Sequence, residues 1–358
     1  MTFTPPDGKK WPVAVLGATG AVGQTFIRLL ANHPWFEVAE VAASERSEGK
    51  PYREATRWLE GDMPPAVADL IVQPVDPSRI KSSIAFSALD SSVAGDVERS
   101  FAQAGKFVLS NAKNFRMEQD VPLVIPEVNA DHLQILERQR KERGWSGAIV
   151  TNANCAATVA AVALAPLEEK FGIDKLFLTT MQAVSGAGYP GVPSLDIIGN
   201  VIPYIADEEP KLELEMTKLL GKYSDGAIVR APMKVSSHTN RVAVEHGHTV
   251  CITVALKNPA TLDQVIATLR EWKGNEATLD LPSRPEHPLQ VMDEPNRPQP
   301  RRDVDLGNGM TVSVGRIRPD PILDVRMVAL GHNTIRGAAG GSVLNAELLA
   351  VTGRFAPA

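Results

Sequence analysis

Short apolar runs separated by polar turns mark the first half of the chain. The first run, residues 13–16, ends in a glycine-rich turn, and residues 25–30 then carry apolar positions at helical spacing, which predicts a strand, a turn and a helix. Because most of the later runs are short and almost wholly apolar, they are typical of parallel strands covered on both faces. Residues 1–154 are therefore predicted to form a doubly wound α/β domain. The later runs are residues 38–43, 70–75, 84–89, 107–109, 123–125 and 148–150.

The pattern changes after Cys155. Residues 249–256 alternate, with valine, isoleucine and leucine on one face and threonine, cysteine and alanine on the other. Such alternation is typical of a mostly antiparallel sheet with unlike faces, so residues 155–334 are predicted to form a separate α+β domain. Further strands are predicted at residues 176–184, 310–317 and 325–330, and helices at 156–170 and 262–272, the second capped by Thr261.

The end of the chain is predicted to return to the first domain. Residues 338–354 have the pattern of a helix, so the first domain would comprise residues 1–154 and 335–358. Residues 282–302 contain six prolines and several charges, which predicts a loop.

Composition narrows the class of protein. A chain of 358 residues can form two domains with buried cores, and its two cysteines exclude a disulfide framework and fit the reducing cytosol. The net charge of −5 does not suit binding to nucleic acid or to anionic lipid. No run approaches about 18 apolar residues, and residues 1–10 lack the apolar core of a signal peptide. We expect a cytoplasmic protein with neither a nucleic-acid nor a membrane partner.

The glycine turn after the first strand is the first candidate for chemistry. Gly17 permits the tight turn, Gly20 lets the backbone approach a pyrophosphate, and Gly23 lets the helix pack closely on the strand. The helix N-terminus would offer free N–H groups to the anion. The spacing is GxxGxxG rather than GxGxxG, and a plain strand–helix turn is the alternative. Its place on the first strand favours a Rossmann-type site made by Gly17, Thr19, Gly20, Ala21, Val22 and Gly23.

The end of the second predicted strand bears on the choice of nucleotide. An NAD site usually has an acidic residue here for the ribose 2′-hydroxyl. Ser44, Arg46 and Ser47 instead offer hydroxyls and a guanidinium that suit a 2′-phosphate, although Glu45 would oppose this if it pointed inward. We favour NADP, with a solvated loop as the alternative.

Cys155 stands where a strand is predicted to end and a helix to begin. A thiol at a helix N-terminus feels the positive end of the dipole, which lowers its pKa from about 8.5 toward 7 and makes a nucleophile suited to acyl transfer. A small buried cysteine is the alternative, which the flanking Asn152 and Asn154 disfavour and which suits Cys251 better. Because no Cys or His lies near Cys155 at ligand spacing, we expect no metal site.

A series of motifs follows in a specific order along almost the whole chain. They are GATGAVG at residues 17–23, ASERS at 43–47, FSAL at 86–89, SNAKNFR at 110–116, PEVN at 126–129, NC at 154–155, QAVSGAG at 182–188, EEPK at 208–211, RVAVEHGH at 241–248 and HNTIRGAAG at 332–340. With these motifs the chain resembles the aspartate-semialdehyde dehydrogenases of archaea and fungi. It departs at Ala153 and Ala243, where proline is common in the family.

The resemblance implies a reaction. The family uses NADPH to reduce β-aspartyl phosphate to aspartate semialdehyde with release of phosphate, at the branch point toward lysine and diaminopimelate, threonine and methionine. A thiolate at Cys155 would displace phosphate to form a thioester, which hydride would reduce. The resemblance also assigns NADP binding to the first domain, and catalysis and dimerisation to the second.

The resemblance selects His248 as the base, since the family motif places a histidine seven residues after an arginine, here Arg241. An unbroken strand would point two residues at this odd spacing to opposite faces, so we expect Gly247 to supply a bulge or a turn. His246 is then an exposed neighbour.

The resemblance also implies the substrate contacts. Arg241 would bind the carboxylate, Glu208 the ammonium, and Lys211 the phosphate together with Arg116 and Asn154. Gln182 would hold the acyl group or the thiol. For Glu208, Glu209 and Lys211 the alternative is a solvated, charged helix start. Further cofactor contacts are implied for Ser87, Ala88, Leu89, Ser185, Gly186 and Asn333.

Two other functions compete with this one. Malonyl-CoA reductase and N-acetyl-γ-glutamyl-phosphate reductase use a similar cysteine and histidine, but an acyl-CoA has no ammonium and needs no partner such as Glu208. A non-catalytic NADP-binding regulator would not keep Cys155, Gln182, Arg241 and His248 together. The resemblance implies a homodimer or a homotetramer.

Overall fold

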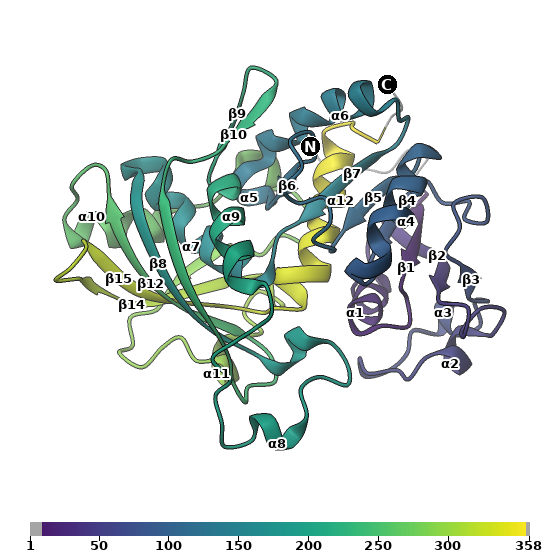
Figure 1. Cartoon of the computed structure of the whole chain (residues 1–358), viewed down its shortest axis with the longest axis horizontal. Coiled ribbons are helices and arrows are strands. Elements are labelled where there is room, and N and C mark those ends of the chain that lie inside the picture. The colour runs from purple at the N-terminus through teal and green to yellow at the C-terminus, as the bar shows by residue number, and fades with distance from the viewer. Residues whose placement is uncertain (1–8, 356–358) are drawn as a thin grey trace.

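The computed structural model describes residues 9–355, and the two ends of the predicted first domain, residues 1–8 and 356–358, lie outside the described residues. The chain forms two large sheets with helices around and between them (Figure 1). Every pairing in the first sheet is parallel, in the order β3-β2-β1-β4-β5-β7-β6. Its strands are β1 (Trp11–Leu16), β2 (Phe36–Ala43), β3 (Gln73–Pro74), β4 (Ile84–Ser87), β5 (Phe107–Ser110), β6 (Leu123–Val124) and β7 (Ala148–Asn152).

The predicted strands of the first half are present, and one is much shorter than expected. The run at residues 70–75 keeps only the two residues of β3 at the edge of the sheet, where Pro74 cannot donate a ladder hydrogen bond. The helices of this half are α1 (Ala21–Leu30), α2 (Tyr52–Ala55), α3 (Pro65–Ala68), α4 (Ser91–Gln103), α5 (Pro126–Asn129) and α6 (Leu136–Arg143).

The second sheet is mixed. Its order is β11-β8-β12-β15-β14-β13; the three central pairings are antiparallel and the two outer ones parallel. The Pro-rich segment, residues 282–302, was predicted to be a loop, but it contains β13 and the start of α11. The strands are β8 (Ile173–Gln182), β11 (Lys234–Arg241), β12 (His248–Leu256), β13 (Leu289–Val291), β14 (Val312–Pro319) and β15 (Val325–Gly331), with a separate hairpin of β9 (Lys222–Ser224) and β10 (Ala227–Val229).

Two long helices of the second half pack on the two sheets, one on each. Helix α7 (Cys155–Phe171) is alanine-rich and buried along most of its length, and it packs on β12, β14 and β15. Helix α12 (Gly340–Val351) follows a π-helical turn at Ile335–Ala339 and packs on β5, β7 and α1. The remaining helices are α8 (Ser194–Ile197), α9 (Glu208–Leu219), α10 (Leu262–Glu271) and α11 (Pro300–Asp303).

Candidate active site

The N-terminus of α7 positions Cys155. Strand β7 ends at Asn152, and the side chain of Asn154 caps α7, because its Oδ1 accepts the N–H groups of Ala156 (2.9 Å) and Ala157 (3.0 Å). Cys155 is thus the first helical residue, and its side chain is half-buried. Gly337 lies directly against it, since a Cβ there would come 2.5 Å from the Cys155 Cβ.

His248 faces the thiol. Its Nε2 lies 3.0 Å from the Sγ of Cys155, and the backbone N–H of Ala183 donates to its Nδ1 over 3.1 Å. Because Nδ1 accepts a hydrogen bond, a neutral ring carries its proton on Nε2 and presents it to sulfur. The structure therefore brings the predicted nucleophile and histidine together, with the histidine completely buried.

The protonation of this pair differs from the sequence expectation. Burial, with the nearby Glu208 carboxylate, raises the pKa of the Cys155 thiol to about 12, despite the helix N-terminus and the Arg116 and Arg241 charges. Burial, with the Arg241 guanidinium, lowers the pKa of His248 to about 3. In the free protein, burial thus shifts the thiol pKa upward, opposite to the direction that the helix N-terminus alone predicts.

Glu208 is part of the same site. It is only 7% exposed, and its Oε1 accepts hydrogen bonds from the side-chain amides of Asn154 (2.7 Å) and Gln182 (3.1 Å). The Nζ of Lys211 lies 4.0 Å from the other oxygen. The alternative of a solvated helix start is therefore wrong for Glu208, while Lys211 stays partly exposed.

Arg241 and His248 reach the site from two different strands. β11 ends at Arg241 and β12 begins at His248, and the two strands flank β8. Gly247 lies in the connection with a φ of +100°, so it is a turn residue and not a bulge in one strand. The Nη1 of Arg241 donates to the Ala183 carbonyl (2.8 Å), and a Cβ at Gly186 would come 2.9 Å from Nη1.

Arg116 reaches the site from the loop after β5. Its Nη1 donates to the Oε1 of Glu215 (2.9 Å), and its Nη2 donates to the Asn111 carbonyl (2.7 Å). The other oxygen of Glu215 accepts the backbone N–H of Asn154 over 2.6 Å. All the residues predicted to contact substrate therefore lie around the N-terminus of α7.

The glycine turn has the shape that a dinucleotide requires. Gly17 has a φ of +74°, and a Cβ there would come 2.7 Å from the Ala88 carbonyl oxygen. A Cβ at Gly23 would come 2.3 Å from the Gly17 oxygen, so only glycine lets α1 approach β1 this closely. Gly20 is exposed and caps α1 with no side chain, which leaves the first turn open to an anion. The partly exposed Thr19, Ala21 and Val22 complete the turn.

The other predicted cofactor contacts lie at two places. Ser44 and Arg46 are exposed beyond β2, whereas Ser47 is buried. Ser87 is also buried, and its hydroxyl donates to Glu98 (2.6 Å), so this side chain is already occupied. Ala88 and Leu89 follow it and are partly exposed.

A second cluster, made by residues of the second half of the chain, faces α1. The Oγ of Ser185 accepts from the Nδ2 of Asn333 (2.8 Å) and lies 3.0 Å from the Nδ1 of His246, whose ring stacks on His332. These residues, Asn333 excepted, line a cavity of about 540 Å³ that reaches Ala21. His246 is therefore a lining residue rather than only an exposed neighbour.

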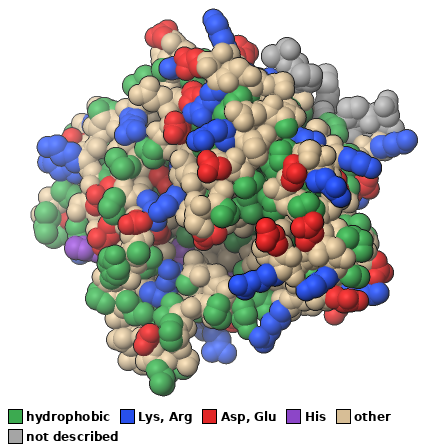
Figure 2. Space-filling model, turned by 45° about the vertical axis from the view of Figure 1, so that its right-hand side comes forward, with side chains coloured by type: hydrophobic (Ala, Val, Ile, Leu, Met, Phe, Trp, Pro, Cys, Tyr) green, Lys and Arg blue, Asp and Glu red, His purple; other side chains and the backbone are tan. Residues whose placement is uncertain are grey.

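Acidic and basic side chains are intermixed on the face of the molecule in Figure 2, which is hollowed near its centre.

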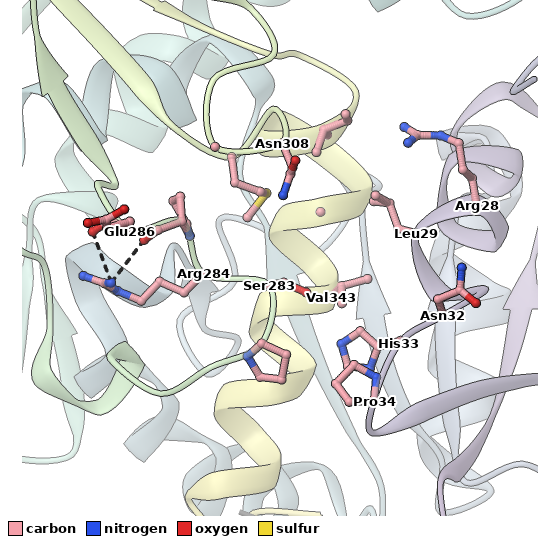
Figure 3. Close-up of a pocket in the computed structure, with 16 residues that line it drawn as sticks. Arg28, Leu29, Asn32, His33, Pro34, Ser283, Arg284, Glu286, Asn308 and Val343 are labelled. Atoms are coloured by element: carbon pink, nitrogen blue, oxygen red, sulfur yellow. Dashed lines mark hydrogen bonds between the residues drawn. The ribbon is translucent and has the colours of Figure 1, made fainter. Parts of the chain in front are cut away.

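A further cavity of about 400 Å³ lies between α1, α12 and the Pro-rich segment (Figure 3). Its one buried histidine, His33, is fully used, by Glu347 at Nε2 (2.7 Å) and by two backbone N–H groups at Nδ1. Neither ring nitrogen of His33 is therefore left to bind a ligand in this cavity.

Within residues 9–355, no group of three or more His, Cys, Asp or Glu side chains is placed to hold a metal ion. In the same part of the chain, no helix is long and apolar enough to cross a membrane.

Comparison with known proteins decides the family. Residues 12–136 match the family model for the NAD binding domain of semialdehyde dehydrogenase, and residues 164–336 match the model for its dimerisation domain. An Archaeoglobus fulgidus protein named aspartate-semialdehyde dehydrogenase is 49% identical over 341 residues, which cover 95% of this chain and 98% of the relative. The chain belongs to the aspartate-semialdehyde dehydrogenase family. A Saccharomyces cerevisiae protein of the same name is 47% identical over 358 residues, 96% of this chain and 98% of its own.

Solved structures of aspartate-semialdehyde dehydrogenases agree with the fold. The Candida albicans enzyme, solved with NADP, is 45% identical, with a TM-score of 0.89 over 96% of this chain and 99% of its own. Aspartate semialdehyde dehydrogenase II from Vibrio cholerae, complexed with ASA, is 27% identical, with a TM-score of 0.73 over 95% of this chain and 98% of its own. The predicted family and fold class are confirmed.

Sequence reasoning missed two groups of this aspartate-semialdehyde dehydrogenase site. Glu215 lies seven residues after Glu208, so both occupy one face of α9, and that spacing was a usable signal. The Ala183 N–H, a backbone group, left no signal in the sequence.

Proposed function

We propose that this chain catalyses the NADPH-dependent reduction of β-aspartyl phosphate to aspartate semialdehyde, with release of phosphate. The observation that carries the proposal is the 3.0 Å contact between the Cys155 Sγ and the His248 Nε2, with Glu208 and Arg241 at the same site. Relatives of this name at 47–49% identity over nearly the whole chain support it.

Cys155 is the proposed nucleophile. Its sulfur forms a bond to the acyl carbon as the bond from that carbon to the phosphate oxygen breaks, so phosphate leaves and a thioester remains. The Nε2–H of His248 donates to the sulfur and stabilises its thiolate, and the thiol proton leaves with the phosphate as hydrogen phosphate. The same N–H can donate a hydrogen bond to the acyl oxygen when that oxygen carries negative charge. NADPH, when bound, supplies the hydride that reduces the thioester to the aldehyde level.

The proposed substrate contacts follow charge. Glu208 takes the ammonium, and Arg241 takes the carboxylate with the N–H groups that the Ala183 carbonyl leaves free. Arg116, Lys211 and Asn154 hold the phosphate, and the Gln182 amide beside Glu208 fixes the acyl group. The Oε1 of Glu208 meets only the neutral amides of Asn154 and Gln182, so the ammonium of an amino-acid substrate would give it a charged partner, which an acyl-CoA lacks.

The proposed cofactor residues are the glycine turn for the pyrophosphate and Ser44, Arg46 and Ser47 for the 2′-phosphate. Backbone atoms of Ser87, Ala88 and Leu89 are proposed to line the same site, since the Ser87 hydroxyl is occupied. Ser185, Gly186 and Asn333 would lie against the nicotinamide. The NADP complex of the Candida albicans relative supports this choice of cofactor.

We also propose a homodimer or a homotetramer and a cytoplasmic site of action. Within residues 155–334, our proposed second domain, Phe177, Cys251 and Thr253 are exposed or half-exposed on the sheet face opposite the buried core. That face suits pairing with a second copy. The two free thiols and the thioester chemistry need a reducing compartment.

The reverse reaction tests the proposal. Aspartate semialdehyde, phosphate and NADP are mixed with the protein, NADPH absorbance is followed, and a parallel cuvette holds malonate semialdehyde and coenzyme A. We expect phosphate-dependent NADPH formation from aspartate semialdehyde only, and none with Cys155→Ser. Activity only with coenzyme A would identify an acyl-CoA reductase, and inactivity in both would leave nucleotide binding alone.

A further inference from the structure

The face of α9 that meets the substrate site carries a carboxylate with no role so far. Glu215 is 1% exposed and is bonded to two segments that are far apart in the chain. One oxygen accepts from the Arg116 guanidinium (2.9 Å), and the other accepts the backbone N–H of Asn154 (2.6 Å). A single buried charge therefore joins the loop after β5 to the start of the helix that bears Cys155.

The backbone of the same loop is held separately. Lys218, three residues after Glu215 on α9, donates to the carbonyls of Arg116 (2.8 Å), Glu118 (2.8 Å) and Val121 (2.7 Å). Lys218 thus fixes where the loop runs, and Glu215 fixes where the guanidinium of Arg116 lies. The two contacts are separable, so a change at Glu215 leaves the three loop bonds in place.

Arg116 has N–H groups that are free to bind an anion. Of its five N–H groups, one is bonded to Glu215 and one to the Asn111 carbonyl. Its Nε is buried and has no partner among the described residues. A buried, unpaired N–H is costly, and a bound anion would satisfy it. The charge of Arg116 also acts on Cys155, which places the guanidinium near the nucleophile.

We infer that Glu215 is a positioning residue for the phosphate of the substrate, acting through Arg116 and the Asn154 backbone. The inference rests on the proposed function. The carboxylate holds the guanidinium and the first residues of α7 in one fixed relation, so that a phosphate leaving the acyl carbon at Cys155 meets preset donors. A phosphate is bound by directed, charge-assisted N–H groups. The affinity for phosphate should therefore depend more strongly on the placement of the Arg116 guanidinium than the affinities for NADP and aspartate semialdehyde do.

The variant Glu215→Gln tests the inference. The amide keeps the size of the side chain, but its one oxygen can serve only one of the two donors, and its NH₂ then faces the other. We expect the KM for phosphate in the reverse reaction to rise at least about tenfold, the loss of one charge-assisted hydrogen bond. The KM values for NADP and aspartate semialdehyde should stay within about twofold, and Glu215→Asp should restore part of the phosphate affinity.

Glu347→Gln is the matched control. Glu347 is an equally buried carboxylate with partners at His33 (2.7 Å) and the Ser283 N–H (3.1 Å), away from the Cys155 site. The Glu347→Gln variant should have a lower melting temperature than the wild type and an unchanged KM for phosphate. If Glu215→Gln does not fold, Glu215→Asp is the test variant. Its shorter carboxylate keeps the negative charge but is too short to reach both Arg116 and the Asn154 N–H.

Two results would overturn the inference. One is a folded Glu215 variant whose phosphate KM equals that of the wild type, and the other is an equal rise in all three KM values, which a merely structural role would give. A wild-type protein without phosphate-dependent NADPH formation would instead overturn the proposed function, and this inference with it.

Discussion

At the scale of single residues, burial and nearby charges together set the state of Cys155. Burial is the main cause of the raised thiol pKa, Glu208 raises it further, and the guanidinium groups of Arg116 and Arg241 favour the thiolate. An ammonium bound at Glu208 would cancel the effect of that carboxylate and leave the effect of the two guanidinium groups. Binding of the amino-acid substrate would therefore itself bring the nucleophile closer to its reactive form.

Alkylation of the free protein tests this protonation state. Because the thiol pKa is raised to about 12 and that of His248 is lowered to about 3, the thiolate fraction rises about tenfold for each pH unit between pH 7 and 10. The rate of iodoacetamide labelling at Cys155, followed by mass spectrometry in a Cys251→Ser background, should rise in parallel without a plateau. A rate independent of pH from 6 to 8 would show a preformed thiolate–imidazolium pair.

Arg46 tests the choice of cofactor at the same scale. It is exposed just beyond β2. Arg46→Ala should raise the KM for NADP at least about tenfold and leave that for NAD nearly unchanged. Arg53→Ala, which removes an exposed arginine paired with Asp69, is the control and should change neither. Equal changes for both cofactors with Arg46→Ala would exclude its contact with the 2′-phosphate.

At the scale of elements, local signals predicted most of the fold. The strand, turn and helix around Gly17 to Leu30 are marked by local features of the sequence, namely an apolar run, the glycine spacing and helical periodicity, and the structure has all three elements. Helix α9 was not predicted beyond its charged start, because its buried face includes Glu208, Glu215 and Lys218, and an apolar pattern cannot reveal a face whose charges are satisfied by distant loops. For the same reason the sequence indicated the residues at Cys155 but not the partners that orient them.

Helix α10 offers a test of a local signal. Thr261 forms a capping box, in which its hydroxyl accepts the Gln264 N–H and the Gln264 side chain accepts the Thr261 N–H. Thr261→Ala should lower the free energy of unfolding by about 1 kcal/mol, measured by urea titration, with activity unchanged. Gln264→Ala removes only the reciprocal bond and should cost less. An unchanged stability for both would mean that tertiary packing alone fixes the start of α10.

At the scale of the whole molecule, the second sheet leaves one apolar area open. Phe177 on β8 is 40% exposed, beside residues of β12 that point the same way. If this face pairs with a second copy, Phe177→Glu should convert the dimer to a monomer in sedimentation velocity, since a charge would be buried in an apolar interface. Ile322 is 86% exposed, so Ile322→Glu is the control and should leave the sedimenting mass of the protein unchanged. A dimer that survives Phe177→Glu would place the interface elsewhere.

The contact between Gly337 and Cys155 joins segments that lie 182 residues apart in the sequence. A side chain at Gly337 would collide with the Cys155 Cβ, so the backbone that encloses the nucleophile tolerates only glycine there. The site around the sulfur is therefore complete only when these two distant segments have folded together.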